Sequence, residues 1–525
     1  MVMVKKERWH RSGFEHDDEG RTILGSAKEM AAWVELGFEE QDKRKIHDEP
    51  FYKHYIDLSN CVLYISYPLD SQEPKSKIFN LCDMAGIVPG IEKIEGDTNY
   101  LFEVKYDIHL DGSVLFGNFF HYVKFDGMVR MDKAIVNNTF SCFKCLFDGY
   151  VYMQDICFDG GYTFEQCDFN KGLVMSSAVV GSINAEFGNC LFKECLSLAA
   201  AGFTKQTHSN PIELRDSTVE NLNISNIRTD GIPFYIQDTT IHGMKMDNLK
   251  MDGTLGFYSC DLDGIVTSVI DEESTNNHIK ELLLHSCNVK AQCHIENSDI
   301  EKVAITFGRI EDSGRLRLSQ CNVGEFVLGS SSILGLMDFF GNTITSISME
   351  ESCVPGYLNF QGNDVKEFKD RQTLRLLKNE AIKVNDKVAA MQLYAKEMIS
   401  LLSDESVSKG DKVSLWLNKA FSNFGQNWIK ALLVTLLLSM AFTLLMLGIG
   451  SRIYQFNPSG EFIGVGTFVT ALLDSINVFS IPLFSETIEK YGLNVFGQIL
   501  YFVIKLVVAY GSWQLVVAFR KYGRS

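Results

Sequence analysis

The 525-residue sequence lacks several features that would assign it directly to a functional class. It contains no Gly-x-x-x-x-Gly-Lys-Ser/Thr phosphate loop, no Gly-x-Ser-x-Gly elbow and no His-Glu-x-x-His pair, so the enzyme classes built on these motifs are not indicated. Positive charge is also scarce, because 49 Lys and Arg residues stand against 66 Asp and Glu residues, a net charge of -17. Nucleic-acid binding needs the opposite balance, so no nucleic-acid partner is expected.

The start of the chain lacks the marks of an export signal. Its first twenty residues, MVMVKKERWHRSGFEHDDEG, have neither an apolar core nor a small-residue cleavage site. We therefore expect the body of the protein to stay in the cytosol, where thiols remain reduced. The 13 cysteines agree with this expectation, since an odd number in a chain without a signal is typical of free thiols.

A zinc site is the alternative interpretation of some of these cysteines. Two groups of thiols and imidazoles are candidate ligands: Cys142, Cys145, Cys157 and Cys167, and His285, Cys287, Cys293 and His294. The loop lengths between them are not those of a zinc ribbon, and most of the cysteines coincide with a sequence repeat. Because free cysteine commonly behaves as a small buried apolar residue, we predict core positions, no metal and no cofactor.

The repeat runs from about Lys105 to Val365. A large apolar residue is followed by two spacers, a small Cys, Ser, Thr or Asn, one spacer and a second apolar residue, as in Phe164-Glu-Gln-Cys167-Asp-Phe169. The small positions are Cys167, Cys190, Ser217, Thr239, Cys260, Cys287, Cys321, Asn342 and Asn363. They are 21 to 27 residues apart, with one gap of 34, and a period of that size is the signature of a solenoid.

Each period is best explained as one coil of a parallel β-helix. It is too short for two packed helices, and its short apolar runs are separated by Gly, Asn and Asp, which favours strands. Large apolar side chains would stack inside and the small residues would occupy corners, over roughly a dozen coils about 4.8 Å apart. The pattern resembles the pentapeptide-repeat proteins, whose coils have four five-residue faces, but its spacing is irregular. We therefore predict a mainly β fold, an irregular right-handed parallel β-helix.

The segments that flank the repeat complete the predicted domain organisation. Residues 1–104 are expected to form an N-terminal cap with a short helix at 27–36, and residues 105–366 the β-helix. Residues 367–427 are expected to form amphipathic linker helices, and apolar residues that recur at steps of three and four predict one long amphipathic helix at residues 370–403. The apolar positions of this linker are Leu374, Leu377, Ala381, Val384 and Val388.

The last domain, residues 428–525, contains two stretches that are poor in charge. Residues 431–451 carry no charge over 21 positions, about the thickness of a hydrocarbon core, and residues 493–519 are interrupted only by Lys505. Positive residues flank this pair on its outer sides: Lys409, Lys412, Lys419, Lys430, Arg520, Lys521 and Arg524. Only Arg452 and Lys490 lie between the two stretches. This pattern predicts two membrane spans with both termini in the cytoplasm.

The segment between the spans is apolar but too short to cross a membrane, which predicts a re-entrant segment. Within it, LLDSINVFSIPLFSE resembles the pore helix and filter region of bacterial potassium-channel-like domains. Residues 479–484 stand where that family has Thr-x-Gly-aromatic-Gly, but they lack the glycines, so a potassium-type filter is not expected. The resemblance covers about the last hundred residues. It implies a homo-oligomeric channel-like domain in a bacterial inner membrane.

The charge of Lys505 is the most informative single feature of this domain. An ionised side chain at bilayer depth costs at least about 2.5 kcal/mol and usually faces a bundle interior, a wet cavity or a partner. Gln498, Lys505 and Ser512 are seven residues apart and share one helix face, so in an oligomer they would line an axis, with Lys505 favouring anions or blocking cations. Asp474 and Asn477 would lie near the opposite mouth. The candidate pore residues are Lys505, Gln498, Ser512, Asp474, Asn477 and Ser480.

A structural role for Lys505 remains the alternative. Its side chain can reach one membrane interface, or it can pair with Asp474 only to hold the re-entrant segment.

Three classes of function are consistent with this organisation. Some β-helices are polysaccharide lyases or hydrolases, but the carboxylates of Asp126, Asp148 and Asp159 each precede glycine, which is turn chemistry, so no enzyme is expected. The favoured prediction is a membrane effector in which a cytosolic β-helix, bound by a protein activator, is coupled to an oligomeric pore. By analogy with bacterial proteins of this layout, its role would be in stress or phage defence. The alternative is a scaffold tethered to the lipid bilayer by two spans that act only as an anchor.

Overall fold

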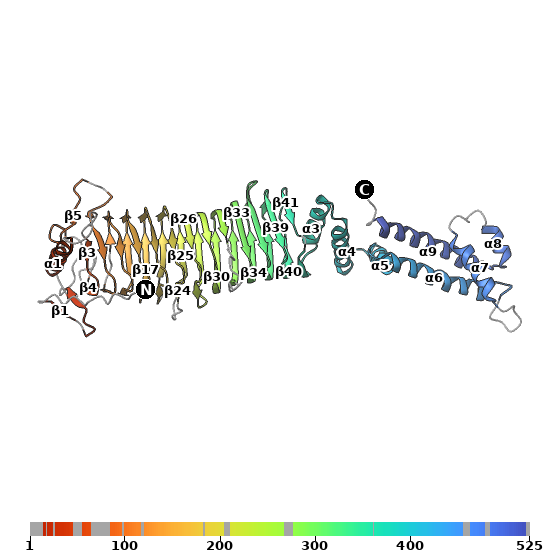
Figure 1. Ribbon diagram of the computed structural model, residues 1–525. Helices are drawn as coiled ribbons and strands as arrows, with labels where there is room; N and C mark the ends of the chain where they lie inside the picture. Colours follow the sequence, from red (N-terminus) through yellow and green to blue (C-terminus); the bar gives the residue numbers. More distant parts are fainter. Residues whose placement is uncertain are drawn as a thin grey trace. The chain divides into compact units, whose positions relative to one another are not determined.

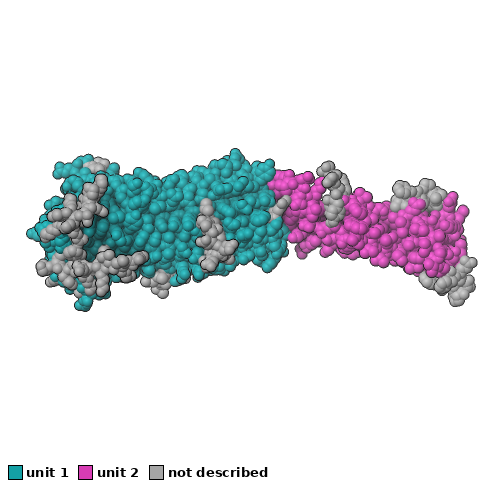
Figure 2. Space-filling model, viewed as in Figure 1, with its two compact units in different colours: residues 1–369 teal, residues 370–525 magenta. Residues whose placement is uncertain are grey.

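The computed structural model describes residues 14–16, 18–24, 27–45, 55–64, 85–96, 99–116, 120–181, 184–203, 210–266, 277–360, 362–454, 463–477 and 484–520. The chain has two compact units, Met1–Lys369 and Asp370–Ser525 (Figures 1 and 2).

The first unit is a parallel β-solenoid of about 11 turns, so the predicted fold class is confirmed (Figure 1). Its strands form two 21-stranded sheets, and successive coils pair in parallel. The parallel ladder begins well before residue 105, because β2 (Thr22–Leu24) pairs with β4 (Cys61–Tyr64), and β4 pairs with β8 (Val114–Phe116). Helix α1 (Ala27–Lys45) starts at the expected residue and continues beyond residue 36.

The coils change from four short strands to two long ones along the solenoid. One early coil consists of β14 (Leu146–Phe147), β15 (Tyr150–Tyr152), β16 (Cys157–Phe158) and β17 (Gly161–Glu165). A later coil has β32 (Asn277–His285) and β33 (Asn288–Glu296) in their place.

Glycine occupies a bend between two short strands of the early coils. Asp148 and Gly149 form the bend between β14 and β15, and a Cβ added at Gly149 would lie 2.5 Å from the carbonyl oxygen of Gly127 in the coil before. Only glycine permits such a close approach of two backbones. The long strands β32 and β33 contain no glycine, but the equally long β30 (Lys250–Tyr258) includes Gly253 and Gly256, so glycine alone does not set the strand length.

A stack of phenylalanines fills the core of the early coils. The ring centroids of Phe125 and Phe147 are 4.9 Å apart, and those of Phe147–Phe169 and Phe169–Phe192 are each 4.8 Å apart. The interplanar angles are 2°, 8° and 4°, so the rings are parallel. All four side chains are buried. The ring spacing equals the strand spacing of a sheet, so each coil contributes one ring to a continuous column.

The small residues of the repeat lie at a corner and bond to the neighbouring coil. The Sγ of Cys167 donates to the carbonyl oxygen of Cys142 at 3.6 Å, and the Sγ of Cys190 donates to that of Phe164 at 3.4 Å. The residue before each thiol is left-handed, with φ of 56° at Gln166 and 50° at Asn189. This sharp turn points a short donor side chain inward, where Cys, Ser, Thr and Asn all reach a carbonyl group.

The 34-residue gap in the repeat marks a change between two corners. By strand register, the column through Cys287 continues to Gly308, Ser331 and Ser352, which we call the first corner ladder. Cys321 belongs to a second corner ladder: Asn277, Ser298, Cys321, Asn342 and Asn363. Ser298 and Ser331 themselves fit the repeat pattern, in Ile295-Glu-Asn-Ser298-Asp-Ile300 and Leu328-Gly-Ser-Ser331-Ser-Ile333. The period is therefore unbroken in space.

The hydroxyl group of Tyr162 is buried in this core without a hydrogen-bond partner among the described residues. Burial raises the pKa of Tyr162, so the phenol stays neutral and its oxygen is simply desolvated. We expect Tyr162→Phe to raise the free energy of unfolding of the solenoid by about 1–3 kcal/mol, since an unmet buried polar group costs that much. Chemical denaturation will measure this change.

Tyr150→Phe is the matched control, because the Tyr150 hydroxyl donates to Glu194 at 2.6 Å. It should not be stabilising. An equal rise in the free energy of unfolding in both variants would show that the unpaired hydroxyl group of Tyr162 is not the cause.

The second unit is helical, and the single long helix predicted for residues 370–403 is wrong, because it is divided into two helices. The chain forms α3 (Arg371–Lys383), α4 (Lys387–Ser403) and α5 (Lys409–Ser422) instead. The break between α3 and α4 falls at Asn385, whose φ is 60°, and Asp386 then caps α4 by accepting a hydrogen bond from the backbone N–H of Ala389. The remaining helices are α6 (Trp428–Gly448), α7 (Val465–Ile476), α8 (Phe484–Lys490) and α9 (Val495–Arg520).

A buried carboxylate joins α3 to α4. The Glu397 side chain is 3% exposed and accepts hydrogen bonds from Arg375 Nε and Lys378 Nζ, each at 2.7 Å. Burial alone would favour the protonated acid, but the bonds from Lys378 and Arg375 outweigh it and lower the pKa of Glu397.

This lowered pKa predicts a pH dependence of the α3–α4 contact. Its stabilisation is fully present above the unfolded-state pKa of glutamate and is lost as the pH falls through the lowered folded-state value. We expect Glu397→Gln to destabilise α3 and α4 at neutral pH and to remove this acid dependence, as measured by amide exchange across both helices. The exposed Glu405→Gln should change neither quantity. Unchanged acid dependence in Glu397→Gln would contradict the prediction.

Candidate functional site

The site of Lys505 is built on two helices that are long and apolar enough to cross a membrane, α6 and α9. Many of their apolar side chains point outward and stay exposed, among them Leu433, Leu437, Phe502 and Leu506. Such a surface is disfavoured in water.

Small residues bring α6 and α9 close together. Ala431, Thr435, Ser439 and Thr443 recur at every fourth position of α6, and all four are buried. A Cβ added at Gly511 of α9 would lie 2.0 Å from Thr435 Oγ1. Small residues with this spacing are the common contact surface of membrane helices. The four-residue spacing was visible in the sequence, but the prediction did not use it.

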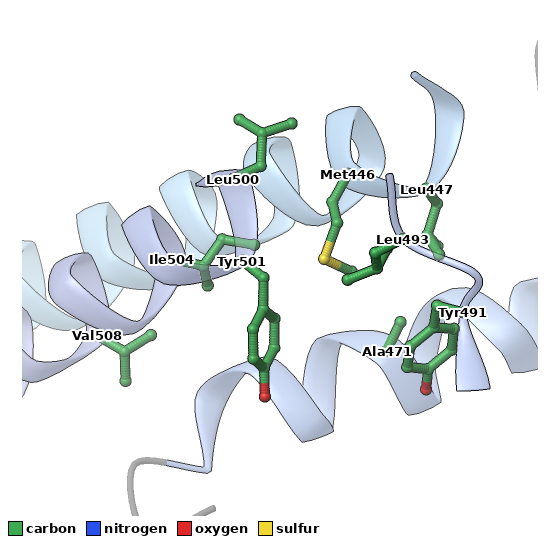
Figure 3. Close-up of a cluster of buried hydrophobic side chains, with 9 residues drawn as sticks. All are labelled: Met446, Leu447, Ala471, Tyr491, Leu493, Leu500, Tyr501, Ile504 and Val508. Carbon is green, nitrogen blue, oxygen red and sulfur yellow. The ribbon is translucent and has the colours of Figure 1, made fainter. Parts of the chain in front are cut away.

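Helix α7 packs against both long helices. Figure 3 shows Ala471 of α7 in a buried cluster with side chains from α6, from α9 and from the segment before α9. The members of this cluster are Met446, Leu447, Ala471, Tyr491, Leu493, Leu500, Tyr501, Ile504 and Val508. The short apolar segment therefore has a fixed place in the core of the unit.

Lys505 bonds to the C-terminal end of α7 within the same chain. Its Nζ donates to the carbonyl oxygen of Asp474 at 2.8 Å and to that of Asn477 at 2.6 Å. The Nζ also lies 5.1 Å from the ring centroid of Tyr501, four residues earlier on α9. The last carbonyl groups of a helix lack partners in the helix and carry partial negative charge, so an ammonium group stabilises them.

The Asp474 carboxylate has different partners. Its Oδ2 accepts from Lys490 Nζ and from the Tyr491 hydroxyl, each at 2.9 Å. The expected pairing of Lys505 with Asp474 thus takes place through the main-chain oxygen. Tyr501, Lys490 and Tyr491 are not among the predicted site residues, although an aromatic residue four positions before a lysine on a helix is a readable signal.

Of the predicted pore residues, Gln498, Lys505 and Ser512 lie on α9, and Asp474 and Asn477 lie at the C-terminal end of α7. The expectation that Asp474 and Asn477 lie opposite Lys505 is wrong, because their carbonyl groups bind it. Gln498 donates to the Leu493 carbonyl group at 3.3 Å, and Ser512 is exposed. Ser480 lies outside the described residues.

A second polar cluster joins α5 to α9. Gln514 is buried, accepts from Ser422 Oγ at 2.5 Å and donates to Asn418 and to the Tyr510 hydroxyl. The amide group is therefore satisfied inside the unit, as a polar group away from water requires.

The candidate zinc ligands have a structural place. Cys145 Sγ donates to the Phe120 carbonyl group at 3.2 Å, and Cys167 follows it along the first corner ladder. Within the described ranges, no group of three or more His, Cys, Asp or Glu side chains is arranged to hold a metal ion.

These features together define a parallel β-solenoid followed by a helical unit with two helices that are able to span a membrane. Comparisons of the chain with protein-family models, with curated proteins and with solved structures give no match.

Proposed function

We propose that the chain is a membrane-anchored β-solenoid protein, in which α6 and α9 fix the chain to a bilayer and the solenoid binds a protein partner. The observation that carries this proposal is the pairing of Lys505 with the α7 carbonyl groups of its own chain. A cation in an apolar helix needs polar partners, and here one subunit supplies them. Neither neighbouring copies nor a watery path is required to explain the charge.

The exposed faces of the helical unit support the membrane location. Next to the apolar surfaces of α6 and α9, helix α5 exposes Val413 and Trp416 among lysines, which is typical of a helix at a lipid interface. The excess of positive charge before α6 and after α9 favours cytoplasmic termini, and the inner membrane is the matching location.

An aromatic strip on the outside of the solenoid is the partner surface that we assign. Neighbouring ring centroids are 5.6 Å apart for Tyr235–Tyr258, 6.0 Å for Tyr258–His285 and 5.4 Å for His285–Phe307. Phe307 is 63% exposed and has a φ of 54°, a conformation that bulky side chains rarely adopt. Exposed aromatic groups are enriched in protein interfaces, and the acidic chain favours a basic partner.

The anchor proposal is tested by exchange of the membrane helices. We expect a chimaera with an unrelated hydrophobic hairpin in place of residues 428–520 to remain in the membrane fraction and to retain any partner captured by the native protein. The native protein in detergent should be a monomer by light scattering. Loss of partner capture in the chimaera, or a fixed native oligomer, would contradict the anchor proposal.

A channel-like oligomer is the second candidate, and the placement of α7 favours it. An anchor needs only its two spanning helices, whereas a short apolar helix held between them by a buried cluster and a lysine is consistent with the re-entrant segment of a pore domain. This candidate predicts an oligomer in detergent and an altered ion flux in Lys505→Leu liposomes. Equal flux in wild type and variant would remove Lys505 from any conduction mechanism.

A further inference from the structure

The C-terminal end of α7 has the donor set of a site for a monovalent cation. Two main-chain carbonyl oxygens converge on the position of Lys505 Nζ. The oxygen of Asp474 lies 2.8 Å from this nitrogen and the oxygen of Asn477 lies 2.6 Å from it. The face of Tyr501 closes the same point at 5.1 Å. Carbonyl oxygens and aromatic faces are the groups that bind ammonium ions.

The charged and dipolar groups around Lys505 Nζ favour one positive group at this position. The Asp474 carboxylate accepts hydrogen bonds from Lys490 and the Tyr491 hydroxyl through its Oδ2. The α7 helix directs the negative end of its dipole at the point, since Asn477 is its C-terminal cap residue.

We propose that this point is a monovalent-cation site for which Lys505 is the built-in occupant, and that the occupied site latches α7 to α9. When the lysine is absent, a free alkylammonium or ammonium ion occupies the same carbonyl groups and restores the latch. The proposal holds for an anchor and for a pore alike, because it concerns the contact between two helices of one subunit.

Three variants of the full-length protein in detergent test the latch by local amide exchange of residues 465–477. In Lys505→Ala, which removes both the charge and most of the side chain, α7 should exchange about ten-fold faster than in wild type. Lys505→Met keeps the volume and removes the charge, so it should show a similar loss. Lys430→Ala is the matched control, because the Nζ of Lys430 also donates to a main-chain carbonyl group, that of Lys419 in α5, and not to α7. It should leave the exchange of α7 close to that of wild type.

Added propylammonium chloride should then restore slow exchange in Lys505→Ala only. The neutral isostere propanol should restore it in none of the proteins, and the filled site of Lys505→Met should not respond to the amine. Full protection of α7 in Lys505→Met, or no response of Lys505→Ala to the amine, would overturn the proposal. If Lys505→Ala folds only when it is purified with propylammonium, the site is supported. If Lys505→Ala fails to fold with every cation tested, the site is refuted.

Discussion

Phe169→Ala is expected to lower the free energy of unfolding of the solenoid by about 3–5 kcal/mol, the usual cost of removing a phenylalanine from a core. Phe169 lies in the middle of the stacked column, with parallel rings 4.8 Å away on both sides. Its removal leaves a cavity, and the coils above and below cannot collapse into it without breaking their ladder of strand pairs. Denaturant unfolding followed by far-UV circular dichroism will report the loss.

Phe307→Ala is the control, because the same residue type is removed from the surface, where the ring is 63% exposed. A change of about 0.5 kcal/mol or less is expected there. Similar losses in the two variants would show that the column is not the main stabilising core of the early coils.

Gly497→Leu is expected to separate α6 from α9 and to destabilise the helical unit by about 3 kcal/mol or more, at the upper end of overpacking costs. A Cβ at Gly497 would lie 2.3 Å from the carbonyl oxygen of Gly450, and a backbone atom cannot rotate away as a side chain can. Titration of the protein from mild detergent into sodium dodecyl sulfate, followed by tryptophan fluorescence, measures this loss.

Gly466→Leu tests whether the close contact, and not the residue type, is responsible. A Cβ at Gly466 of α7 meets nothing within 4 Å among the described residues. This variant should unfold at the same fraction of sodium dodecyl sulfate as the wild type. If Gly497→Leu also unfolded at the same fraction of sodium dodecyl sulfate as the wild type, the contact between Gly450 and Gly497 would not hold the two helices together.

The fold of the solenoid was readable from the sequence because its repeat reflects a local requirement. A left-handed residue followed by a small donor recurs once per coil at the first corner ladder, as at Gln166 and Cys167. The two corner ladders were not separable in the sequence, since Cys287 and Cys321 obey one pattern at opposite corners. Only the strand register distinguishes them.

The environment of Lys505 was predictable only in part. Its cost in an apolar helix follows from composition, and this identified the residue as one that needs partners. The partners are main-chain oxygens at the end of α7, which any sequence provides and no pattern of side chains reveals. The linker break was missed for a related reason: the apolar spacing continues across Asn385, although the backbone turns there.

The pairing of each coil with its neighbours constrains how this protein can vary in length. The strands of each coil pair only with those of the two neighbouring coils, so the duplication or loss of one complete turn joins strand edges that already match. Removal of one residue inside a strand such as β32 would instead exchange its inward and outward side chains and place Leu284 in water. Homologues of different size should therefore differ by whole turns or at the bends between strands.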